Sequence, residues 1–162
     1  MKKGIVTVAL ALFVASMFIV STAVAADRPA PTSGEVKVTK DDKGAVTAVK
    51  IGDQAVALDD MGKNLAALMA DKKTEARGRK NDAGELAVRW FSAEFVGAVK
   101  KGDAGFTVTA NGVTLPAEDK GKKLDAFDGK DALITGSVGM GRNETAAKLT
   151  VKDAKEAPKK TE

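Results

Sequence analysis

The 162-residue chain contains no cysteine and no histidine. Without cysteine there is no disulfide framework, no thiol nucleophile and no lipid-modified cysteine. Without histidine there is no Ser-His-Asp or Cys-His catalytic arrangement and no zinc site built on imidazole. Because these absences remove the commonest catalytic and metal-binding sites, the sequence predicts a protein that is not an enzyme and that holds no cofactor or metal.

Aromatic residues are scarce, at 4% of the chain, with one tryptophan and no tyrosine. A nucleic-acid binder usually combines a basic stripe with aromatic side chains that stack on bases. The charges form no such stripe, since 26 basic and 22 acidic residues are interspersed. Nucleic acid is therefore not an expected partner.

The amino terminus begins MKKGIVTVALALFVASMFIVSTAVAAD, in which two lysines precede a long apolar run. The run ends at Ala23-Val24-Ala25, as in a secretory signal peptide cleaved after residue 25. An uncleaved membrane anchor is the alternative, because the uncharged run approaches the roughly 20 residues that span a bilayer. Cleavage would leave 137 residues with net charge +2. It predicts a periplasmic or secreted protein without stable membrane insertion.

The rest of the chain reads as two copies of one unit between two irregular ends. Residues 26–33 are a proline-containing linker, and residues 153–162 are a charged tail that is expected to be disordered. Between them, MGKNLAAL at 61–68 and KGKKLDAF at 120–127 share glycine, lysine and leucine at the same offsets. We therefore predict one β-rich unit over residues 34–96 and a second over residues 97–152.

Each unit is predicted to contain three strands, a helix and two further strands. Alternating valines in GEVKVTK indicate the first strand, and leucines at helical spacing indicate a helix over residues 62–71. In the second unit, Asn111-Gly112 supplies the positive φ angles of a type I′ hairpin turn, and Leu124 and Phe127 mark the matching helix. About 60 residues is near the lower limit for a self-sufficient core, so each sheet must close or pack on its twin.

A five-stranded, partly open barrel with a helix between strands three and four is the OB-fold. The predicted fold is thus mainly β with short helices, as tandem OB-like barrels, although the copies could also form one merged sheet. The chain resembles secreted bacterial proteins with OB-like domains, including the bacterial OB-fold (BOF) family. The resemblance covers residues 34–152 and rests on Gly34–Val38, Leu65, Leu68, Gly78, Leu124, Phe127, Gly136 and Val138. It implies binding of a small ligand or a partner in the periplasm, usually without catalysis.

One basic cluster is the candidate ligand-binding site. Alternation along a strand places Arg77 and Arg79 on one face, and Arg89 falls on the outer face of the neighbouring strand. Glu75 shares the face of Arg77 and Arg79, so a solvated cross-strand ion-pair network is the alternative to an anion site. Trp90, spaced with Leu86 and Val88, is expected in the core, yet in OB-like barrels such an aromatic can also stack on a ligand.

Other motifs have simpler interpretations than catalysis or metal binding. The acidic pairs Asp41-Asp42, Asp59-Asp60 and Glu118-Asp119 fall at turns or strand ends, where aspartate bonds locally to the backbone. A carboxylate-based hydrolase would need two of these acids in one pocket, and Asp41–Gly44 lacks the alternating oxygen ligands of a calcium loop. The glycines of 136–141 are not followed by a helix pattern, which argues against a phosphate loop.

Two functions fit these observations. The first is an exported, non-catalytic binding or interaction module of the bacterial envelope, for a small anionic ligand or a protein partner, with Arg77, Arg79, Arg89 and Trp90 as the candidate contacts. The second is a structural envelope protein that assembles through its sheet faces or edges.

Overall fold

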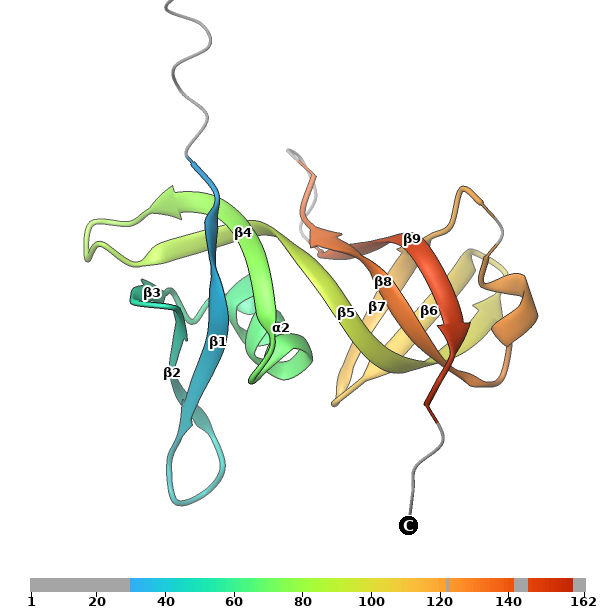
Figure 1. The fold of residues 1–162 in the computed structure, drawn as a ribbon, viewed down its shortest axis with the longest axis horizontal. Helices are drawn as coiled ribbons and strands as arrows, with labels where there is room; N and C mark the ends of the chain where they lie inside the picture. Colours follow the sequence, from blue (N-terminus) through green and yellow to red (C-terminus); the bar gives the residue numbers. More distant parts are fainter. Residues whose placement is uncertain (1–29, 122, 142–145, 159–162) are drawn as a thin grey trace, which may run out of the picture. The chain divides into compact units, whose positions relative to one another are not determined.

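The computed structural model describes residues 30–121, 123–141 and 146–158, and its helices and strands belong to one compact unit, Pro31–Glu162 (Figure 1). The fold is mainly β, as the alternating apolar patterns predict. The expected signal peptide or anchor, residues 1–25, lies outside the described residues. Among the residues described, no helix is long and apolar enough to cross a membrane.

The elements follow the predicted order in the first half of this unit. In chain order they are β1 (Thr32–Lys40), β2 (Val46–Ile51), β3 (Gln54–Val56), α2 (Asp60–Met69) and β4 (Lys73–Lys80). A 17-residue strand, β5 (Leu86–Gly102), comes next. It is followed by β6 (Gly105–Ala110), β7 (Val113–Glu118), the 3₁₀ turn η1 (Asp125–Phe127), β8 (Asp131–Gly139) and β9 (Lys148–Glu156).

The strands form one sheet in the order β3-β2-β1-β4-β5-β6-β7-β9-β8. Because β8 also pairs with β5, a ring of hydrogen bonds runs through β5, β6, β7, β9 and β8. The ring is not a clean barrel, since β7 and β9 meet only at Ala117 with Leu149 and at Glu118 with Thr150. On the other side of β5, β3 returns to it through the single pair Val56 and Leu86.

The core lies on the inner faces of these strands and is one hydrophobic cluster. Burial alternates along the second half of β5, as a half-buried sheet requires, and β1 and β2 contribute Val36, Val49 and Ile51. Helix α2 contributes its apolar stripe, with Leu65 and Leu68 almost fully buried. Leu124, beside η1, is fully buried in the same cluster.

The second helix is shorter than the sequence predicts. Only the 3₁₀ turn η1 occupies the region where the second copy was expected to repeat α2. So short a segment gains too few hydrogen bonds to offset the cost of nucleating an α-helix. Leu124 and Phe127 still pack in the core. The apolar pattern therefore predicted their burial correctly but predicted too long a helix.

Strand bounds also differ from the expected segments. β5 continues through residues 96 and 97, where the two units were expected to be separated. β1 begins at Thr32, inside the expected linker, and β9 continues to Glu156, inside the expected disordered tail. The tail prediction is therefore wrong for residues 153–156, because the neighbouring strand β8 offers them backbone partners from Thr135 to Ala132.

Candidate functional site

A bulge between β4 and β5 decides which side chains reach the outer surface. Arg77 pairs with Trp90 and Gly78 pairs with Val88, so Arg89 is an extra residue on β5. A bulge of this kind changes the direction in which the following side chains point. Arg89 is exposed and Trp90 is half-buried, while the next residue, Phe91, is fully buried.

The expectation that Trp90 belongs to the core with Leu86 and Val88 is therefore wrong. Trp90 is not part of the buried cluster, and Phe91 takes the core position instead. Period-two alternation failed here because the extra residue shifts the side-chain pattern by one position. The shift brings Trp90 to the same face as the arginine cluster.

Arg77 is engaged within that face. Its Nη2 lies 3.0 Å from Oε1 of Glu75, and its guanidinium carbon lies 5.5 Å from the centre of the Trp90 ring. The pair is exposed, so its net contribution to stability is small. Arg77 thus forms a surface ion pair within β4, whereas the alternative interpretation expected a network across strands.

Arg79 and Arg89 are arranged differently. Together with Met140 and Gly141 they line a hollow of about 320 Å³, and none of its described lining residues is a carboxylate. In the part of the chain that the structure describes, neither guanidinium is in an ion pair. Two cationic groups that share one hollow, with no counter-charge among the described residues that line it, can bind an anion through charge-assisted hydrogen bonds.

Trp90 borders a second hollow of about 270 Å³. Its other lining residues are Glu118, Ser137, Gly139, Met140, Gly141, Lys148 and Thr150. The two hollows share Met140 and Gly141, which lie at and just after the end of β8. The structure thus places the four predicted site residues on one face, with Arg77 paired and the other three bordering hollows.

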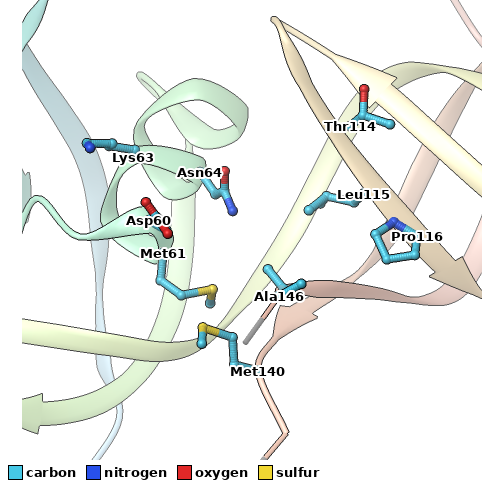
Figure 2. Close-up of a pocket in the computed structure, with 10 residues that line it drawn as sticks. Asp60, Met61, Lys63, Asn64, Thr114, Leu115, Pro116, Met140 and Ala146 are labelled. Atoms are coloured by element: carbon cyan, nitrogen blue, oxygen red, sulfur yellow. The ribbon is translucent and has the colours of Figure 1, made fainter. Parts of the chain in front are cut away.

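A third hollow, of about 350 Å³, could not be found from the sequence (Figure 2). It is lined by residues of α2, of β7 and of the segments that flank residues 142–145. In Figure 2 the side chains of Met61 and Met140 point toward one another, whereas the ammonium group of Lys63 points away. These segments are far apart in the chain and share no motif, so only the tertiary structure brings them together.

The acidic pairs serve the backbone near them. Oδ1 of Asp41 accepts hydrogen bonds from the backbone N of Lys43 and of Ala45, at 2.9 and 2.8 Å. Oδ1 of Asp59 accepts one from the backbone N of Gly62 at 2.9 Å and caps α2. Among the described residues, no three acidic side chains gather where they could hold a metal ion.

The same local role extends to the third pair. Oδ2 of Asp119 accepts a hydrogen bond from the backbone N of Leu124 at 2.7 Å, and Glu118 forms an exposed ion pair with Lys120 at 3.2 Å. Asp59 and Asp119 thus each bond to the backbone that opens a helical segment. Their positions follow from turn chemistry.

Comparison of the chain with protein-family models, with curated proteins and with solved structures found no match.

Proposed function

We propose that the protein is an exported, non-catalytic binding module of the bacterial envelope that holds a small anionic ligand at Arg79 and Arg89. The observation that carries the proposal is the hollow that these two guanidinium groups share, whose described lining residues include no carboxylate. Export is supported by the signal-peptide pattern of residues 1–25 and places the protein in the periplasm or outside the cell.

We further propose that the fold is a tandem of two OB-like units that share β5. The support is the repetition of backbone register. Val36 on β1 pairs with Ile51, and Val99 on β5 pairs with Val108 in the same way. The backbone N of Val36 donates to Lys72 O, and the backbone N of Val99 donates to Lys130 O, both at 2.9 Å.

The closing strand of each unit repeats the same features. The parallel pair Val56 and Leu86 corresponds to the parallel pair Ala117 and Leu149. Gly78 faces a bulge on β5, and Gly136 faces a bulge on β9. In this correspondence the first half of β5 is the fifth strand of one unit, and its second half is the first strand of the other.

Comparison of matching positions in the two units also indicates which residues the strands require in order to form. Gly78 matches Gly136, and both sit against a backbone carbonyl. Arg79 instead matches Ser137, and the bulge residue Arg89 matches Lys152. Because the second unit builds the same strands without these arginines, their presence in the first unit supports a function beyond folding.

The test is a thermal-denaturation series of the purified protein with inorganic phosphate and sulfate at constant ionic strength. A ligand that binds only the folded state raises the melting temperature. At a ligand concentration of 100 times Kd, it adds about 2.7 kcal/mol to the free energy of unfolding. We expect such a rise in the parent protein and its loss in the double variant Arg79→Ala/Arg89→Ala.

The matched control is Lys73→Ala/Lys80→Ala, which removes two exposed cations from the same strand and leaves the hollow intact. It should respond to the anions as the parent does. Equal rises in all three proteins would reject the arginine site, and no rise in any of them would favour a structural envelope protein that assembles through its sheet faces or edges.

A further inference from the structure

We infer that the ligand is an acidic saccharide, whose ring lies on Trp90 and whose carboxylate or phosphate group lies at Arg79 and Arg89. The inference rests on the proposed anion site and extends it to the neighbouring hollow. Trp90 lines one hollow, the two arginines line the other, and Met140 and Gly141 line both. One molecule can therefore occupy the two hollows together.

The indole of Trp90 is kept clear by the residue opposite it. Gly139 pairs with Trp90 across β5 and β8, and a Cβ added to Gly139 would lie 3.2 Å from Cδ1 of the indole. Gly139 does not have a positive φ angle, so its backbone conformation does not require glycine. What the missing side chain provides is open space beside the ring.

The rest of this hollow is polar. Ser137 and Thr150 contribute hydroxyl groups, Glu118 a carboxylate and Lys148 an ammonium group, and Trp90 is the one aromatic residue among the described lining residues. An aromatic surface beside several hydrogen-bonding groups suits a pyranose, which has an apolar ring face and hydroxyl groups at its edge. The chemistry of the hollow thus matches a sugar better than an aliphatic anion.

A nucleotide fits less well. Proteins that bind bases commonly stack them on several aromatic side chains or enclose them between apolar ones. Among the described residues that line this hollow, Trp90 is the one aromatic residue, and the Arg77 guanidinium lies over its ring at 5.5 Å, so a ligand can stack only on the other face. A sugar ring needs only one aromatic partner, so the saccharide is the favoured ligand class.

Trp90 is the only tryptophan of a chain without tyrosine, so intrinsic fluorescence reports on this hollow directly. The purified protein is titrated with a short oligomer of galacturonic acid and with glucose 6-phosphate. Their neutral counterparts are the methyl-esterified oligomer and glucose. Inorganic phosphate and uridine monophosphate complete the series, and melting temperatures are measured in parallel.

We expect at least one acidic sugar to change the fluorescence and to bind about tenfold more tightly than inorganic phosphate, because the stacked ring adds to the anion contact. Its neutral counterpart should bind more weakly. Gly139→Val, which places a side chain beside the indole, should reduce saccharide affinity to that of inorganic phosphate without affecting phosphate binding. If Gly139→Val folds poorly, the double variant Ser137→Ala/Thr150→Val tests the polar lining instead. It should weaken the binding of acidic sugars and leave the binding of inorganic phosphate unchanged.

The outcomes separate the two proposals. Phosphate binding that depends on Arg79 and Arg89, without preference for an acidic sugar, would overturn the saccharide inference and leave the anion site standing. Tighter binding of uridine monophosphate than of either acidic sugar would also overturn it. Absence of binding by every anion would remove both proposals.

Discussion

At Gly78 the backbones of β4 and β5 approach so closely that an added Cβ would lie 2.1 Å from the carbonyl oxygen of Ala87. At Gly136 the same construction gives 2.3 Å to the carbonyl oxygen of Thr150. Neither glycine has a positive φ angle, so close approach and not backbone conformation accounts for both. These contacts accompany the two bulges, one of which turns Arg89 and Trp90 outward.

Gly78→Ala and Gly136→Ala should each destabilise the protein, at the upper end of the about 1–3 kcal/mol that overpacking costs. In both variants the new methyl group would clash with a backbone carbonyl oxygen, which cannot move away by a side-chain rotation. Urea denaturation of each variant measures the change. Gly102→Ala is the control, because its Cβ would lie 3.7 Å from the nearest atom, an ordinary contact, and it should be nearly neutral.

Asp153 offers a residue-level test of order at the carboxyl end of the chain. Lys155 donates a hydrogen bond to its carboxylate, and this lowers the pKa of Asp153 below the ordinary value of 3.8. A group whose pKa is lowered by folding adds stability above its unfolded pKa, and that stability is lost as pH falls through the folded pKa. The effect is confined to acidic pH and weakens with salt, because both groups are exposed.

We expect an NMR titration of the Asp153 carboxyl to give a pKa below 3.8 in the parent, and a value nearer 3.8 in Lys155→Met. An ordinary value in both proteins would show that the ion pair between Asp153 and Lys155 does not form in solution.

At the scale of single elements, α2 forms where the local sequence pattern predicts a helix. Asp59 caps the helix through the backbone N of Gly62, and the apolar stripe with Leu65 and Leu68 faces the core. Both features lie within a few residues of one another, so both could be predicted from the sequence. They also account for Asp59 without any catalytic role.

Asp59→Ala should cost about 1 kcal/mol of stability, because it leaves a helix-terminal N–H without its acceptor. Asp59→Asn keeps an oxygen acceptor and should stay close to the parent. Chemical denaturation distinguishes them. If both variants lost the same stability, the negative charge and not the hydrogen bond would be the stabilising feature.

The strand β5 is the opposite case. The sequence predicted that the first unit ends at residue 96, but β5 continues to Gly102. Its continuation pairs with β6 on one side and β8 on the other. Hydrogen bonds to a partner on each edge keep these residues in the strand. The partner strands are distant in the sequence, so the residues of β5 alone do not show that it continues.

At the scale of the whole molecule, β5 is the strand that the two halves of the sheet share. It pairs with β3, β4, β6 and β8, and the buried residues of both halves form one cluster. Each half is near the lower size limit for an independent core. The two halves should therefore unfold together.

Urea unfolding followed by Trp90 fluorescence and by far-ultraviolet circular dichroism should give coincident, single transitions. Trp90 pairs with Arg77 on β4 and with Gly139 on β8, so its fluorescence senses both sides of β5. Circular dichroism reports all strands. Two separated transitions would mean that the halves are independent units despite the shared strand.

The sequence by itself determined the mainly β composition, the place of α2, the turns at Asp41 and Asn111, and the choice of the arginine cluster. These depend on periodicity, capping and turn chemistry, which act over a few residues. Only the tertiary structure decided that Arg77 is paired, that Arg79 and Arg89 share a hollow, and that Trp90 faces outward. Those outcomes depend on one extra residue in the register of β5 against β4 and on contact with the end of β8. An extra residue in one of two paired strands changes the face that the following side chains occupy, and its position depends on both strands, so alternation within one strand does not show it.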